Sequence, residues 1–247
     1  MNKETWKTFR KTINRFRLLI ENINVLLPDL SAVIQQLVDS REGPSYTVDT
    51  PVVYNMALED FTRDSEIKLI LVGDNPGRRE QENRRYLVGP SGKIAEKFFR
   101  DNPELGIDLR KNVLILNKTP IHTPRTTELK TLYSLGSETL KDAVLSSQKA
   151  MAELLEKFWT LSAGTIIIWI IGYSEMRKGG IFEMYTETLK TLCTANPSFK
   201  ESIFLFRHFS MNQFSIDLKN QALPGENLRK SLERIGRTYR ERILGAI

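Results

Sequence analysis

The sequence predicts an α/β protein with three layers, α/β/α, in which helices cover both faces of a central four-stranded parallel sheet. Four short runs of apolar, β-branched residues lack polar alternation, which is typical of strands buried on both faces. Segments with helical spacing separate these runs, and such an alternation builds a parallel sheet through right-handed crossovers. With 247 residues, of which 40% are hydrophobic, the chain is long enough to bury a substantial core.

The chain opens with a predicted helical extension. Residues 4–38 carry apolar side chains at helical spacing, with an interruption near Pro28. We expect residues 1–42 to pack as an extension on an α/β domain formed by residues 43–247. Within that domain the expected strands are 67–72, 112–116, 165–171 and 202–206, and the expected helices are 92–100, 137–159, 175–192 and 226–244.

The composition indicates which binding partners and which cellular compartment to expect. The chain has 36 Lys and Arg against 30 Asp and Glu, which gives a net charge of +6. This charge favours a polyanion as the binding partner. Much of the excess lies in basic stretches near both termini, which solvated faces of terminal helices would also explain. The single cysteine, Cys193, excludes an intramolecular disulfide, a cysteine-rich zinc site and a four-cysteine iron–sulfur cluster within the chain, and it favours the cytoplasm. The longest apolar stretch, 164–172, is shorter than the roughly 20 residues of a membrane span. We expect a monomer without membrane association.

Polar residues follow each predicted strand. Ligands of open parallel sheets bind at the carboxyl ends of the strands, so these positions are the candidates for function. The turns concerned are 73–77, 117–120, 172–174 and 207–210. One of the two histidines of the chain, His208, lies in the last of them.

Four side chains in these turns could carry chemistry, and each has a structural alternative. Asp74 or Asn75 could orient a water molecule or stabilise positive charge, although both are also common turn residues. Asn117 offers a donor and an acceptor to a base edge, or it ties down a loop. His208 has three candidate roles: a general acid, a hydrogen-bond donor to developing negative charge, or a structural residue.

The segment VGPSGK (88–93) lacks the first glycine and the Ser or Thr of a nucleotide-binding P-loop, which excludes that motif. Its backbone amides, at the start of a predicted helix, could still bind an anion such as a DNA phosphate. An ordinary helix cap at Ser91 explains the same residues equally well. Both interpretations remain open at the level of the sequence.

Three segments occur in a characteristic order: GDNPGRREQENRRYLVGPSG (73–92), NVLILNKTPIHTPRTTEL (112–129) and RHFSMNQF (207–214). Together they resemble the uracil-DNA glycosylase superfamily, over about residues 53–216. The first two are similar to motifs of its thermophile-type branch, but the iron–sulfur cysteines of that branch are absent. The form G-x-N-P-G resembles the mismatch-specific and single-strand-selective branches. The third segment resembles the final H-P-S motif and its DNA-inserting loop.

The resemblance implies roles for the residues at matching positions and requires neither a metal nor an organic cofactor. The implied catalytic residues are Asp74, Asn75 and His208, of which Asp74 or Asn75 would position water and His208 would stabilise charge on the leaving base. The implied base-binding residues are Gly73, Pro76, Gly77, Tyr86, Leu87 and Asn117. The implied DNA contacts are Gly89, Pro90, Ser91, Gly92, Lys118, Arg125, Ser210, Met211 and Asn212.

The implied activity is hydrolysis of the N-glycosidic bond of uracil, or of a related deaminated base, in DNA after the nucleotide flips out of the stack. Two departures matter. Leu87 stands where the family has a stacking phenylalanine, which leaves Tyr86 as the alternative, and Phe209 replaces the usual proline. These departures favour a second hypothesis, a member that binds DNA or a nucleobase without cleaving it. A third hypothesis is an enzyme for another base, such as hypoxanthine or xanthine.

Overall fold

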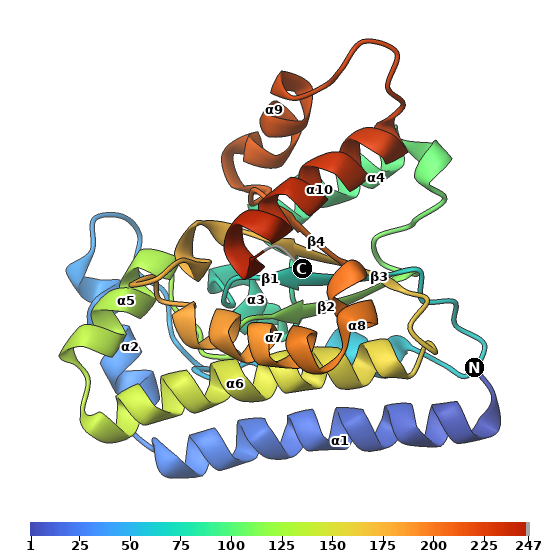
Figure 1. Cartoon of the computed structure of the whole chain (residues 1–247). Coiled ribbons are helices and arrows are strands. Elements are labelled where there is room, and N and C mark those ends of the chain that lie inside the picture. Colours follow the sequence, from blue (N-terminus) through green and yellow to red (C-terminus); the bar gives the residue numbers. More distant parts are fainter. Residues whose placement is uncertain (246–247) are drawn as a thin grey trace.

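The computed structural model of the chain describes residues 1–245 and confirms the predicted three-layer α/β/α fold (Figure 1). Four parallel strands form one sheet in the order β2-β1-β3-β4. They are β1 (Leu69–Gly73), β2 (Val113–Asn117), β3 (Ile167–Ile171) and β4 (Ile203–Phe206). Every residue of β1 and β2 is buried, which explains why these strands lack polar alternation.

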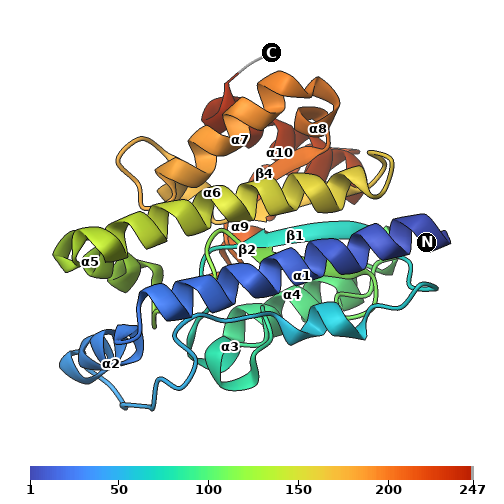
Figure 2. The same cartoon turned by 90° about the horizontal axis from the view of Figure 1, so that it is seen from below.

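One face of the sheet is covered by α1 (Lys3–Leu26), α6 (Glu138–Thr160) and α7 (Glu183–Ala195). Figure 2 shows these helices side by side in one layer. The rings of Phe9 in α1 and Phe158 in α6 lie 5.5 Å apart, and both border a small cavity together with Ile70 of β1 and Leu114 of β2. Residues 1–42 and the α/β domain therefore share one core.

The opposite face is covered by α4 (Pro90–Asp101), α9 (Gln213–Asn220) and α10 (Leu228–Leu244). Aromatic rings fill the space between these helices and the sheet. Trp169 of β3 stacks on Phe99 of α4 at 5.6 Å and on Phe214 of α9 at 5.8 Å. Rings of this size, packed face to face and edge to face, contribute both buried area and specific geometry to the core.

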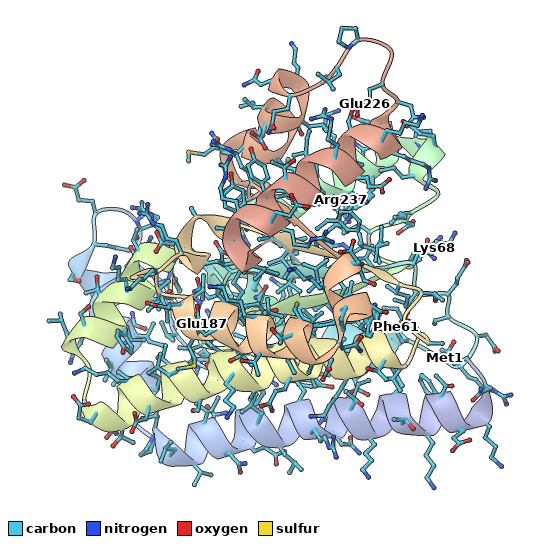
Figure 3. All side chains as sticks on the ribbon, in the orientation of Figure 1. Met1, Phe61, Lys68, Glu187, Glu226 and Arg237 are labelled. Carbon is cyan, nitrogen blue, oxygen red and sulfur yellow. The ribbon has the colours of Figure 1, made fainter. Side chains whose placement is uncertain are left out.

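The direction of α1 decides where the N-terminal segment ends. The helix begins near the amino ends of the strands, where Figure 3 shows Met1 beside Phe61. It spans 24 residues, or roughly 36 Å at the rise of an α-helix, so it crosses the width of the molecule. The following helix α2 (Leu30–Ser40) therefore lies at the opposite edge, on the same side as α5 (Thr126–Leu135) in both views (Figures 1 and 2).

The predicted long elements are confirmed, but several short ones are not anticipated by the sequence pattern. The helix expected over 175–192 begins only at Glu183, because Gly179, with φ +74°, and Gly180 form a turn after a short 3-10 segment. The unanticipated helices are α3 (Arg78–Asn83), α5, α8 (Pro197–Glu201) and α9, and the 3-10 turns are Met56–Asp60, Pro103–Leu105, Tyr173–Met176 and Ser210–Asn212.

Within residues 1–245, no single helix has the length and apolar character needed to cross a membrane. The pair α1 and α2, bent by 80° where they join, meets that test only when the two are taken together.

Close contact between α10 and β4 depends on the absence of a side chain at Gly236. A Cβ at this position would lie 2.7 Å from Cβ of Phe204 and 2.8 Å from Cζ of Phe206. In an exposed helix a Gly→Ala change stabilises by about 1 kcal/mol, whereas overpacking a core costs about 1–3 kcal/mol. Gly236→Ala should therefore lower the free energy of unfolding measured by urea denaturation. Lys230→Ala, on the exposed face of the same helix, is the control, and a stabilised Gly236→Ala protein would contradict the packing described.

Candidate active site at the carboxyl edge of the sheet

A cavity of about 970 Å³ opens at the carboxyl ends of the strands. Its walls come from the segments that follow all four strands, together with the start of α4 and the start of α5. All of the predicted site residues line it except Pro76, Tyr86, Lys118 and Asn212. The structure therefore brings residues from three separate sequence segments into one hollow, as expected for a ligand site in a parallel sheet.

Lys118 holds this edge of the sheet together from below the cavity. Its side chain is completely buried, and its Nζ donates to Asp74 Oδ1 at 2.5 Å, to the carbonyl of Ile171 at 2.7 Å and to the carbonyl of Gly73 at 3.4 Å. Burial lowers the pKa of Lys118, and the Asp74 carboxylate opposes that shift. An ammonium group has three N–H donors, and here each meets an acceptor.

The prediction that Lys118 contacts a DNA phosphate is therefore wrong. A basic residue directly after a strand is typical of a surface anion site, but this side chain turns back under the sheet edge, where a carboxylate and two carbonyls satisfy it. Its role in the structure is to fix Asp74 and to tie the ends of β1, β2 and β3 to one another.

Asp74 is anchored through one oxygen and stays in contact with the cavity. Its side chain is 17% exposed, and Oδ1 accepts from Lys118. The carboxylate lies against the Cα of Gly172, whose φ is +79°. A Cβ on Gly172 would lie 2.5 Å from Oδ1 and 2.8 Å from Oδ2 of Asp74. Glycine at this position is thus required for the observed position of the carboxylate.

Asn75 has a different environment, although it is the next residue. Its Nδ2 donates to Thr123 Oγ1 at 2.8 Å, and its Oδ1 accepts from Thr126 Oγ1 at 3.1 Å. Both ends of the amide are thus engaged by the segment that leads into α5. This arrangement favours Asp74 over Asn75 as the group that acts on a ligand, and it gives Asn75 the role of positioning the loop.

Asn117, the last residue of β2, offers an unsatisfied donor to the cavity. The residue is only 4% exposed, and its Nδ2 has no hydrogen-bond partner within residues 1–245. Its Oδ1 lies over Gly73, where a Cβ would approach to 2.6 Å. A buried donor without an acceptor costs about 1–3 kcal/mol, so this amide is suited to a ligand that brings an acceptor.

His208 is held in one tautomer by the turn that follows β4. Its Nδ1 accepts the backbone N–H of Ser210 at 3.1 Å, with Ser210 Oγ at 2.9 Å. Because a backbone amide can only donate, the neutral ring carries its proton on Nε2. Burial lowers the pKa of His208; Asp74 opposes this shift and Lys118 adds to it. The ring is therefore a neutral N–H donor at neutral pH.

The loop above the cavity is shaped by Glu80, a residue that the sequence analysis did not single out. Its buried carboxylate accepts from the amide of Gly77 at 2.5 Å and from the amide of Leu87. Burial raises the pKa of Glu80, and these two amides counter the shift. The spacing of Glu80 three residues after Gly77, at the start of α3, is the signal that could have identified it.

This loop corrects the expectation for Tyr86. Leu87 adopts a left-handed conformation with φ 54°, and it is Leu87 that lines the cavity. Tyr86 points into the core, where its hydroxyl donates to the carbonyl of Val53 at 2.6 Å, so it cannot replace the stacking aromatic. Pro76 is likewise buried and supplies only its carbonyl to the surroundings.

Two further segments border the cavity. Helix α4 begins at Pro90 with Gly89 as its cap, so the alternative of a cap at Ser91 is wrong and the free amides of the first turn face this region. Met211 is 81% exposed with φ 50°, and it stands on the rim next to Ser210. Asn212 borders a neighbouring groove between α4 and α9 instead.

His122, the second histidine, is buried directly behind the site. Its Nδ1 lies 2.8 Å from the carbonyl of Pro76, which can only accept, so Nε2 is the acceptor for the hydroxyl of Tyr46 at 3.0 Å. Burial lowers the pKa of His122 to about 4 and raises the pKa of Tyr46 to about 12. This chain of hydrogen bonds connects the segment that follows α2 to the turn that carries Asp74.

Comparison with known proteins identifies no relative: no protein-family model matches the chain, and no curated protein sequence matches it. Within residues 1–245, no group of three or more His, Cys, Asp or Glu side chains is arranged to hold a metal ion. The function must therefore be inferred from the site.

The burial of Lys118 yields a stability prediction. Lys118→Met leaves the Asp74 carboxylate and the Ile171 carbonyl without this donor, whereas the Gly73 carbonyl still accepts from the backbone N–H of residue 118. Breaking a buried ion pair on one side costs about 3–5 kcal/mol. We expect a loss of that size in urea denaturation at neutral pH. The exposed Lys149 provides the matched control, Lys149→Met, which should change stability by less than about 0.5 kcal/mol. Equal stabilities for the two variants would show that Lys118 is a free surface lysine.

The environment of His122 predicts how stability depends on pH. The folded state binds no proton at His122 until its pKa of about 4, whereas the unfolded chain binds one near pH 6.5. The shift thus contributes its full stabilisation above about pH 6.5, and this is lost as pH falls toward 4, to a total of about 3 kcal/mol.

The measurement compares the free energy of unfolding of the wild type with that of His122→Gln across this range. The slope should be smaller in the variant. The other histidine, His208, is unchanged in both proteins, so the difference isolates His122. Parallel pH profiles would contradict the assigned environment.

Proposed function

We propose that the chain is a DNA glycosylase that hydrolyses the N-glycosidic bond of uracil, or of a related deaminated base, in DNA. The observation that carries this proposal is a set of three groups in one cavity: the unpartnered Nδ2 of Asn117, the neutral N–H donor of His208 and the anchored carboxylate of Asp74. Two donors suit the carbonyls of a base, and a carboxylate suits positive charge on a sugar.

Base selection would depend on Asn117. Uracil presents a carbonyl oxygen at its 4-position, which accepts a hydrogen bond from the buried Nδ2. Cytosine presents an amino group there, so two donors would face each other. Leaving such a buried donor unpaired is what allows hydrogen-bonding sites to reject close analogues strongly.

The chemical step separates two opposite charges. As the bond between C1′ and the base nitrogen breaks, its electron pair moves to the base, and positive charge develops on the sugar. His208 donates from Nε2 to the base carbonyl at the 2-position and stabilises the anion, while the Asp74 carboxylate stabilises the cation and orients the attacking water. The water oxygen bonds to C1′, its proton passes to solvent, and the base anion later takes a proton from water.

The rim would hold the DNA around the flipped nucleotide. The amides at the start of α4 can bind a phosphate, and Met211 is exposed where an apolar side chain could fill the space left by the base. Flipping costs a few kcal/mol and is easiest in single strands or at mismatches.

Two observations favour a second candidate function, binding of a nucleobase in DNA without cleavage. Lys118 already neutralises one oxygen of Asp74, which weakens the field that a sugar cation would experience, and Leu87 offers no aromatic face to a base. Both features preserve recognition by Asn117 and reduce catalytic power.

The two functions are separated by single-turnover release of base from a uracil-containing single strand, followed by alkaline cleavage. Wild type should leave abasic sites. Asp74→Asn and His208→Ala should slow release by about 10²–10⁴-fold, because each removes a charge-stabilising group. Asn75→Ala is the matched control at the neighbouring position, and it should cost about tenfold or less because Asn75 acts through the loop.

An inert wild type that still binds the oligonucleotide would support binding without cleavage. Release of hypoxanthine or xanthine but not uracil would show that the enzyme acts on another deaminated base. Strong loss in Asn75→Ala with little loss in Asp74→Asn would overturn the assignment of Asp74.

A further inference from the structure

Four of the arginines that line the cavity are Arg41, Arg78, Arg79 and Arg125. They come from three parts of the chain, namely the segment after α2, helix α3 and the start of α5. The guanidinium carbons of Arg41 and Arg78 lie 5.5 and 4.8 Å from the ring centre of Tyr46. The aromatic ring thus holds two like charges in place that would otherwise repel each other.

The carboxylates in this region neutralise only part of the charge of these four arginines. Glu82 pairs with Arg78 at 2.7 Å and with Arg79 at 3.6 Å. Glu128, also near Tyr46, has an Oε2 that is buried without a hydrogen-bond partner. Within residues 1–245, Arg41 and Arg125 form no ion pair. The guanidinium of Arg41 reaches only the carbonyl of Pro44 at 3.4 Å, and its Nε is buried without an acceptor.

We propose that Arg41 and Arg125 form a clamp for a backbone phosphate of the DNA strand whose base occupies the cavity. This inference rests on the proposed function and extends it to the N-terminal segment, which the motifs do not cover. A planar guanidinium with an unused Nε–H is matched to two phosphate oxygens, and the start of α5 adds the positive end of a ten-residue helix beside Arg125.

The fold explains how residue 41 reaches the site. Helix α1 runs the width of the molecule, so α2 and the segment that follows it lie at the edge that α5 also occupies (Figures 1 and 2). The hydrogen bonds from Tyr46 through His122 to Pro76 then fix this segment against the turn of Asp74. Buried hydrogen bonds thus connect the segment that carries Arg41 to the turn of Asp74.

The cavity is large enough for a segment of a DNA strand as its ligand. At about 970 Å³ it is as large as sites for whole drug-sized ligands, and a single pyrimidine would occupy a small part of it. Arginines outnumber carboxylates among its charged wall residues, which also include Arg207. A charged groove that continues beyond the base pocket suits the neighbouring phosphates.

The test measures binding of a short uracil-free single strand as a function of salt, which needs no catalytic activity. Arg41→Gln and Arg125→Gln should each weaken binding about fivefold at moderate salt and reduce the slope of log affinity against log salt by about 0.7. Arg15→Gln is the matched control, because Arg15 is exposed on α1 and lies outside the cavity walls. Thermal unfolding of each variant shows that the fold is intact.

A second arm locates the contact. Oligonucleotides in which one phosphate at a time is replaced by a neutral methylphosphonate are bound by wild type and by Arg41→Gln. When the contacted phosphate is the one replaced, the affinity of wild type should fall about fivefold, and the affinity of Arg41→Gln should not fall further. Equal losses in both proteins at every position, or unchanged salt slopes in both arginine variants, would overturn the clamp even if base release is observed. Loss of base release with retained arginine-dependent binding would overturn the glycosylase proposal and leave the clamp standing.

Discussion

The site depends on the interactions of the buried Lys118 ammonium group. It lies under the carboxyl ends of β1, β2 and β3 and satisfies a carboxylate and two backbone carbonyls that converge there. Parallel strands leave such carbonyls unpaired where they diverge into loops, and a buried carbonyl without a partner is costly. One cation therefore stabilises the edge of the sheet and fixes the position of Asp74 in the same contact.

Much of the fold could be predicted from the sequence because its long elements are strongly patterned. The four apolar runs became the four strands, and the helices around 92–100, 137–159 and 226–244 lie within a few residues of α4, α6 and α10. Helices α3, α5 and α8 were missed because they are only five to ten residues long, too short for a period to emerge. Their ends are determined by tertiary contacts, such as the hydrogen bonds of Asn75 to Thr123 and Thr126.

The site was predictable as a location but not in its internal contacts. Topology alone places Asp74, Asn117 and His208 at one edge of the sheet, and the structure gathers all three around one cavity. Sequence does not tell which way a side chain turns at a strand end. Lys118 therefore resembled a surface phosphate ligand, and Tyr86 a stacking residue, until the left-handed backbone of Leu87 placed Tyr86 in the core. His122 lies within segment 112–129 but was given no role there, and its importance emerges only from its partners, Tyr46 and Pro76.

The same buried cation also reconciles two demands that the proposed chemistry places on neighbouring groups. Cleavage of a glycosidic bond needs negative charge beside the sugar and an uncharged donor beside the base. Lys118 fixes the position of the Asp74 side chain through their ion pair, and its positive charge, added to burial, lowers the pKa of His208 and so keeps that ring neutral. Asp74 by itself favours the imidazolium form of His208, and Lys118 acts in the opposite direction. Placing the cation behind Asp74 leaves the carboxylate and the neutral imidazole free to act on opposite ends of the same bond.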